Sequence, residues 1–206
     1  PEPVAQLLTL GESSCVGNNC LDYPAMGLGA EHVPDLIRMA TNMYPRMMDG
    51  ERAEAWAPVH AWRALGQLRA EAAIEPLIGL FRFVDEEEDD WVGEDLPEAM
   101  GLIGPAAIQA LAAYLSDTAH GLWARITAGE GLAKIGQGHP GARDACVAAL
   151  TGQLERFAEN GDDLNAFLIS DLVDLGAVES APVMEQAFAA DAVDPSVQGD
   201  WEEVQI

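Results

Sequence analysis

Residues 98–111 decide the fold, and they read EAMGLIGPAAIQAL. A helical phrase with apolar spacing ends at a Gly–Pro break, and a second helical phrase follows at once. Proline suits the first turn of that second helix, because the N–H that it lacks would have no intrahelical partner there. The stretch therefore predicts the end of one helix, a short turn and the beginning of another.

The same phrase occurs four times along the chain. Its anchor positions are Leu65, Met100, Leu132 and Leu172, which are separated by 35, 32 and 40 residues. A period of this size is typical of a solenoid unit made of two helices. The four copies read WRALGQLRAEAAIEPL (62–77), EAMGLIGPAAIQAL (98–111), GLAKIGQGHPGARDACVAAL (131–150) and LVDLGAVESAPVMEQAF (172–188).

These copies resemble the HEAT-repeat family, in particular the short bacterial HEAT-like repeats also seen in phycobilisome lyase subunits. The shared motif is A-L-G-x-L/I, a turn, then A-x-x-x-L, as in residues 64–68 and 99–103. The resemblance covers residues 31–206 and implies stacked antiparallel helix pairs that form a right-handed superhelix. It also implies that the second helix of each pair lines the concave face, and it implies no single chemistry.

We therefore expect an all-α protein, an α-solenoid of about five stacked helix pairs. Residues 1–30 are expected to form an N-terminal cap with one short helix near 3–10, and residues 31–206 one continuous repeat array. The predicted pairs are 31–43 with 53–67, 70–83 with 93–103, 105–116 with 121–136, 141–158 with 163–175, and 179–190 with 198–206.

The charge balance limits the classes of partner. The 206 residues carry a net charge of −25, and Lys134 is the only lysine. Such a surface repels phosphate backbones and anionic lipids, so we expect no direct nucleic-acid binding and no membrane binding. It attracts basic proteins or cations, although the charge can also serve solubility alone.

The hydrophobic pattern, the first residues and the cysteines indicate where in the cell the protein is located. No apolar run approaches the length of a transmembrane helix, and the first ten residues lack the basic region of a signal peptide. The three cysteines, Cys15, Cys20 and Cys146, do not make a disulfide framework. We expect a cytoplasmic, bacterial protein.

Three tryptophans occupy one position of the repeat. Trp56, Trp91 and Trp123 each lie nine residues before an anchor, at the start of a second helix. Packing at the seam between repeats would explain them, because an indole buries a large area and keeps its N–H near water. Alternatively they form an aromatic row along one groove wall, since tryptophan is enriched at binding hot spots.

The longest run of like charge precedes the second of these tryptophans. It comprises Asp85, Glu86, Glu87, Glu88, Asp89 and Asp90, and it is expected in the connection between two helices. Part of its acidity suits a helix N-terminus. Three interpretations stay open: a solvated loop, a contact patch for a basic partner, and a cation site.

No metal or cofactor is expected. The acidic run lacks the alternation and the glycine of an EF-hand. Cys15, Cys20 and His32 have no second ligand pair for zinc. Residues 136–141 match G-x-G-x-x-G formally, but they join two predicted helices, whereas a dinucleotide fingerprint follows a strand.

The function expected from the sequence is non-enzymatic: a protein–protein interaction or scaffold module. The partner is another protein with a basic surface, bound on the concave face, with tryptophans as anchors and the acidic run for steering. No catalytic residues are assigned. The alternatives are a chaperone-like or lyase-type enzyme subunit and an acidic nucleic-acid mimic. The predicted contact residues are Trp56, His60, Trp62, Asp85, Glu86, Glu87, Glu88, Asp89, Asp90, Trp91, Glu94, Asp95 and Trp123.

Overall fold

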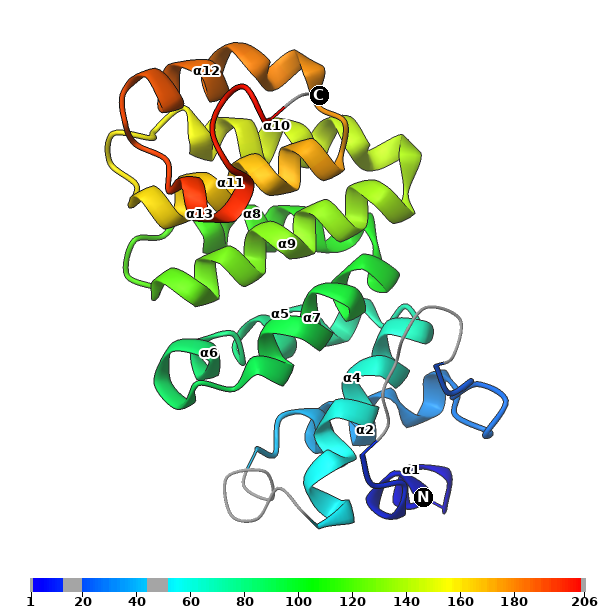
Figure 1. Cartoon of the computed structure of the whole chain (residues 1–206). Coiled ribbons are helices and arrows are strands. Elements are labelled where there is room, and N and C mark those ends of the chain that lie inside the picture. The colour runs from blue at the N-terminus through cyan, green and yellow to red at the C-terminus, as the bar shows by residue number, and fades with distance from the viewer. Residues whose placement is uncertain (1, 13–19, 44–51, 205–206) are drawn as a thin grey trace.

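The computed structural model describes residues 2–12, 20–43 and 52–204, and this part of the chain is all-α. The helices follow one another from the N-terminal end (blue) at the bottom to the C-terminal end (red) at the top (Figure 1). One continuous hydrophobic cluster runs the whole way, from Val4 to Val204. Each part of the chain therefore buries its apolar side chains against its neighbours along the stack.

The first helices of the predicted pairs form one layer. They are α2 (Val33–Ala40), α5 (Ile74–Ile78), α8 (Ile108–Ser116), α10 (Arg143–Leu154) and α12 (Ala181–Ala189). From α5 onward, each contacts the next: α5 with α8, α8 with α10, and α10 with α12. A single 3-10 turn leads into each helix of this layer, and these turns are η2 (Ala30–His32), η4 (Glu71–Ala73), η5 (Pro105–Ala107), η6 (Pro140–Ala142) and η7 (Val178–Ser180).

The second helices form the other layer. They are α4 (Ala57–Gln67), α7 (Asp90–Ile103), α9 (Leu122–Gly138), α11 (Asp162–Asp174) and the short α13 (Pro195–Gln198). They too pack in chain order, α4 on α7, α7 on α9, α9 on α11 and α11 on α13. The remaining elements are α1 (Glu2–Gln6) and η1 (Leu7–Thr9) at the N-terminal end, η3 (Ala53–Trp56) before α4, and α6 (Arg82–Glu87) before α7.

The four anchor positions are equivalent in this architecture. Leu65, Met100, Leu132 and Leu172 lie on α4, α7, α9 and α11, and each is fully buried. Burying one such side chain contributes about 1.5–3 kcal/mol relative to leaving it in water. The repeated phrase in the sequence thus marks the same core position in successive helix pairs.

Glycines let the second helices approach one another closely. A Cβ at Gly66 of α4 would lie 3.1 Å from the Cα of Ala99 on α7. A Cβ at Gly101 of α7 would lie 2.8 Å from the Cβ of Lys134 on α9. In both pairs the two residues are 33 apart in sequence, so the same contact recurs one repeat later.

Three predicted elements differ from the structure. The expected helix 70–83 is split, because i→i−3 hydrogen bonds at Leu80 and Phe81 tighten the chain after Gly79 and redirect it into α6. The acidic run is not a loop between helices, since its first half ends α6 and Asp90 begins α7. The expected helix 198–206 is wrong: α13 ends at Gln198, Gly199 has a φ of 78°, and residues 201–203 form a turn. Residues 205–206 lie outside the described part.

The close approach at Gly101 gives a matched pair of variants. We expect Gly101→Ala to lower the free energy of unfolding by about 1–2 kcal/mol, because the added methyl group would push α7 away from α9. Gly152→Ala on α10 should raise it by about 0.5–1 kcal/mol, because alanine favours helix and nothing lies within 4 Å of the new Cβ. Urea unfolding of both variants measures the two values, and equal effects would contradict the close approach.

Candidate functional site

The second-helix layer carries a cavity of about 550 Å³. It lies where α7, α9 and α11 meet, three neighbouring helices in Figure 1, and Val84 of α6 borders it. A volume of this size is typical of sites that hold a small ligand or a few side chains of a partner. The lining residues are Val84, Asp90, Gly93, Glu94, Pro97, Glu98, Trp123, Ile126, Thr127, Glu130, Lys134 and Phe167.

One wall of the cavity is aromatic. The side chain of Trp123, in the first turn of α9, is 47% exposed, unlike the other tryptophans of the chain. Its ring meets the ring of Phe167 on α11 edge to face, with centroids 5.8 Å apart. This pair presents a large apolar surface that the fold itself leaves half uncovered.

Much of the remaining lining is charged. Asp90, Glu94 and Glu98 stand on α7 and are exposed, while Glu130 and Lys134 stand on α9. The Lys134 ammonium lies 2.6 Å from a carboxylate oxygen of Glu98. Four carboxylates therefore share one ammonium in the lining, which leaves the cavity with a strongly negative potential.

A regular pattern on α9 assembles much of the site. Trp123, Thr127, Glu130 and Lys134 are spaced i, i+4, i+7 and i+11, so they lie along one face of the helix. Thr127 donates its hydroxyl proton to the backbone carbonyl of Trp123 at 2.9 Å. The sequence offered this spacing as a signal, but only Trp123 of the four was predicted.

Beside this face lies a buried carboxyl group that the sequence did not single out. Asp171 of α11 is 6% exposed, and its Oδ2 would be 2.9 Å from a Cβ placed at Gly129 of α9. Within the described residues, neither Asp171 nor Glu130 has a hydrogen bond or an ion pair. Because glycine at position 129 leaves room, an aspartate can occupy the seam between the two helices.

Burial raises the pKa of Asp171 well above its usual range, and the neighbouring carboxylate of Glu130 adds to this effect. Burial is also the main cause of the raised pKa of Glu130. Both shifts have the same physical origin, since a low-dielectric site disfavours the charged form of an acid. The charged groups that act on this pair are Glu94 and Glu98 from α7, Lys134 from α9 and Asp174 from α11.

The acidic run has a structural use at its first residue. The Asp85 carboxylate accepts hydrogen bonds from the backbone N–H groups of Trp123 at 3.0 Å and of Ala124 at 2.9 Å. It thereby caps the N-terminus of α9 from another helix, because the N-cap residue there, Gly121, has no side chain. A Cβ at Gly121 would overlap this carboxylate.

The other members of the run also have separate positions. Glu86 pairs with Arg82 at 2.7 Å, and Asp89 accepts from the Trp91 backbone N–H as the N-cap of α7. Asp90 lines the cavity, and Glu88 adopts a left-handed conformation with a φ of 53°. The run is thus divided among two caps, an ion pair and one cavity wall.

The predicted tryptophan row is divided as well. Trp56 and Trp91 pack against each other edge to face, with centroids 4.7 Å apart, and both are half-buried. The Arg63 guanidinium lies 5.9 Å from the centroid of the Trp91 ring. At the repeated position, Trp56 and Trp91 therefore pack within the protein, whereas the side chain of Trp123 remains exposed.

Three predicted contact residues require correction, because they are buried. His60 is 1% exposed, with Nδ1 at 2.8 Å from the Tyr23 hydroxyl and Nε2 at 2.8 Å from the carbonyl of Gly11. Trp62 is fully buried and donates its indole N–H to the Ala40 carbonyl at 2.9 Å. Asp95 is also buried and receives two hydrogen bonds from Arg63. None of these side chains presents a surface to a partner.

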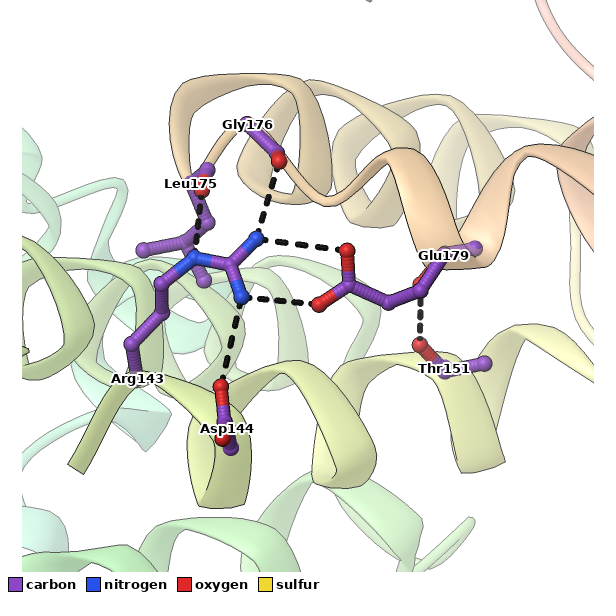
Figure 2. Close-up of polar contacts among 7 residues, drawn as sticks. Arg143, Asp144, Thr151, Leu175, Gly176 and Glu179 are labelled. Atoms are coloured by element: carbon purple, nitrogen blue, oxygen red, sulfur yellow. Dashed lines mark hydrogen bonds and ion pairs between the residues drawn. The ribbon is translucent and has the colours of Figure 1, made fainter. Parts of the chain in front are cut away.

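A second polar cluster, on the first-helix layer, caps the C-terminal end of α11. Figure 2 shows Arg143, the first residue of α10, reaching the end of α11. Its guanidinium donates to the carbonyls of Leu175 at 2.9 Å and Gly176 at 2.8 Å, and it pairs with Glu179 at 2.7 Å. Arg125 similarly donates to the Leu115 carbonyl near the end of α8. Cations favour helix C-termini, so these contacts are structural.

The structure also shows where the residues of the metal and dinucleotide interpretations lie. Across residues 2–12, 20–43 and 52–204, no three His, Cys, Asp or Glu side chains gather in a way that could hold a metal ion. Cys20 is disulfide-bonded and Cys146 is a buried free thiol, while Cys15 lies outside the described residues. The G-x-G-x-x-G match joins α9 to α10 through η6, as the predicted helices implied.

In the described part of the chain, no single helix combines the length and the apolar composition needed to cross a membrane. The helical segments 90–103 and 105–116 reach that length and composition only when they are taken together, and the chain bends by 112° between them. Comparison of the chain with protein-family models, with curated proteins and with solved structures finds no match in any of the three.

The contribution of the Asp85 cap to stability can be measured by comparison with Glu87, an acidic residue on the same helix. We expect Asp85→Ala to lower the free energy of unfolding by about 1 kcal/mol, because two N–H groups at the start of α9 lose their acceptor. Glu87→Ala removes the same charge from an exposed position on the same helix and should change it by less than about 0.5 kcal/mol. Urea unfolding measures the difference, and equal losses would show that Asp85 acts only through its charge.

The buried carboxyl group predicts a pH-dependent gain in stability. A raised pKa means that the folded state binds the proton more tightly than the unfolded state does. The charged carboxylate therefore lowers the free energy of unfolding as pH rises above the ordinary carboxyl range, and this loss of stability is complete above the folded pKa. We expect Asp171→Asn to raise the free energy of unfolding by about 1 kcal/mol at neutral pH, because an amide costs less to bury without a partner. The gain should vanish near pH 4.

Thermal unfolding across this pH range measures the effect. Glu185→Gln is the control, because it removes an exposed carboxylate on α12 that is not among the charges acting on Asp171. A gain of equal size in both variants, or one that persists at low pH, would contradict the assignment of the penalty to the buried position of Asp171.

Proposed function

We propose that this protein is a HEAT-like α-solenoid that binds another protein on its second-helix layer. The two layers of helices packed in chain order support a repeat array, and so do the four equivalent buried anchors. A right-handed superhelix, with the second helices on its concave side, is part of the proposal. Such arrays use extended concave surfaces for binding.

The observation that carries the proposal is the acidic cavity beside Trp123. A half-exposed tryptophan next to a hollow is the kind of side chain that dominates binding energy at interfaces. The four carboxylates in the lining outnumber the one lysine, so the cavity is negatively charged and is complementary to a partner with a basic surface. Apolar anchoring and charge complementarity therefore coincide at one place on the molecule.

The proposed contact surface differs from the one expected from sequence. It keeps Trp123, Asp90 and Glu94, adds Glu98 and Phe167, and leaves out the buried side chains described above. The exposed residues Glu86, Glu87 and Glu88 remain candidates for steering, because long-range attraction needs only charge at the surface.

The composition of the cavity favours binding over catalysis. Its lining consists of carboxylates, one lysine, apolar side chains and one threonine whose hydroxyl donates to a backbone carbonyl. Nucleophilic catalysis needs a nucleophile within hydrogen-bond reach of a base that a third group orients. We accordingly propose a binding module in preference to an enzyme subunit.

The test compares two variants with equal changes in charge. Glu94→Gln/Glu98→Gln neutralises the cavity, and Glu75→Gln/Glu185→Gln neutralises exposed positions on α5 and α12 in the other layer. Each is immobilised beside wild-type protein, and the proteins captured from a native lysate at low salt are identified by mass spectrometry. Their affinities are then measured over a series of salt concentrations.

We expect the cavity variant to bind the captured basic partner at least about tenfold more weakly, which corresponds to roughly 1.4 kcal/mol. It should also show a flatter salt dependence, while the control stays within about twofold of wild type. Trp123→Ser should weaken binding further, as expected for a hot-spot residue. Equal capture by all four proteins would overturn the proposal.

A further inference from the structure

The cavity lining contains one carboxyl group without a partner, and a second such group lies beside the cavity. Glu130 lines it, and Asp171 lies one helical turn along α11 from the lining residue Phe167. The Asp171 carboxyl lies against Gly129, the sequence neighbour of Glu130, and the charge of Glu130 acts on it, so both acids lie near the seam between α9 and α11. Within the described residues neither has a hydrogen bond or an ion pair, although Asp171 is only 6% exposed.

The one cation nearby does not satisfy this pair. The ammonium of Lys134 is engaged by Glu98, which is 61% exposed, at 2.6 Å. A partly desolvated acid without a protein donor gains from a guest that supplies one, because the guest then offsets the cost of desolvation. The pair therefore marks a place where a guest with several N–H donors and a positive charge would be favoured.

The rest of the cavity limits the shape of such a guest. Trp123 and Glu130 lie on one face of α9, seven residues and about 10 Å apart along the helix axis. Ile126 and Phe167 line the space as well, so apolar side chains share the cavity with the exposed indole and Glu130. A long side chain with an aliphatic stem and a charged end fits this arrangement.

We propose that the cavity is a receptor for one arginine side chain of the partner protein. The guanidinium binds the carboxylates of Glu130 and Asp171, and its stem and the flanking residue lie against Trp123 and Phe167. This inference rests on the proposed function and specifies what the partner must present at this cavity.

Arginine fits better than lysine for two reasons. Two carboxylates on neighbouring helices offer four acceptor oxygens, and a guanidinium supplies five N–H donors in a planar fork. Guanidinium is also less strongly hydrated than ammonium and stacks on aromatic rings, so it enters a partly apolar cavity at lower cost.

The experiment uses three small probes on the whole chain. They are N-acetyl-arginine methylamide, the lysine analogue and the citrulline analogue, which has nearly the shape of arginine without its charge. NMR follows the indole N–H signal of Trp123, which is identified by its loss in Trp123→Phe. We expect a saturable shift with the arginine probe and a dissociation constant on the order of a millimolar.

The lysine and citrulline probes should each bind at least about tenfold more weakly than the arginine probe. Glu130→Gln should weaken the arginine probe by about tenfold, whereas Glu75→Gln on the other layer should leave it unchanged. Asp171→Asn provides a second variant, and we expect a loss of similar size. Equal binding of arginine and citrulline, or of arginine and lysine, would overturn the inference, and so would an arginine affinity that both carboxyl variants leave unchanged.

The outcome is separable from that of the capture experiment. If the cavity variant loses its captured partner but no arginine probe binds, protein binding stands and the arginine receptor falls. If the arginine probe binds through Glu130 but capture does not depend on the cavity, the receptor has no protein partner and the inference falls with the proposed function.

Discussion

The close approach of successive second helices is the constraint on which the rest of the structure depends. Gly66 meets Ala99, and 35 residues later Gly101 meets Lys134, at distances where even an added methyl group would crowd the facing helix. This approach brings the buried anchors Leu65 and Met100 into a continuous core. Dispersion and the hydrophobic effect then act across these seams, because successive helices bury apolar side chains against one another.

The same constraint shapes the candidate site. Gly129 admits the carboxyl of Asp171 to the seam between α9 and α11, where a side chain at position 129 would crowd it. Gly121 similarly admits the carboxylate of Asp85 to the N-terminus of α9. Small residues thus set the distance between neighbouring helices. They also determine where an acidic side chain can approach a helix N-terminus or the protein interior, so the packing of the helices affects the electrostatics of the cavity.

The acidic run and the tryptophans show how one residue type serves several purposes. Asp85 and Asp89 cap helices because a carboxylate near free N–H groups is favoured there, while Asp90 lines the cavity. Trp56 and Trp91 pack on each other, whereas Trp123 remains half exposed. Composition and spacing alone treat the members of each set alike. Their differences arise from which helix lies opposite each of them.

Sequence alone determined the helical class, the repeat period and the positions of the core anchors, because these depend on local propensity and on apolar spacing within single helices. It also determined the negative charge from which a basic partner is proposed. Only the tertiary structure decided that His60, Trp62 and Asp95 are buried, that Phe167 joins Trp123 and Glu130 in the cavity lining, and that Asp171 lies beside them at Gly129. Residues some forty positions apart come together through helix packing, and neither periodicity nor composition records which faces of two helices meet.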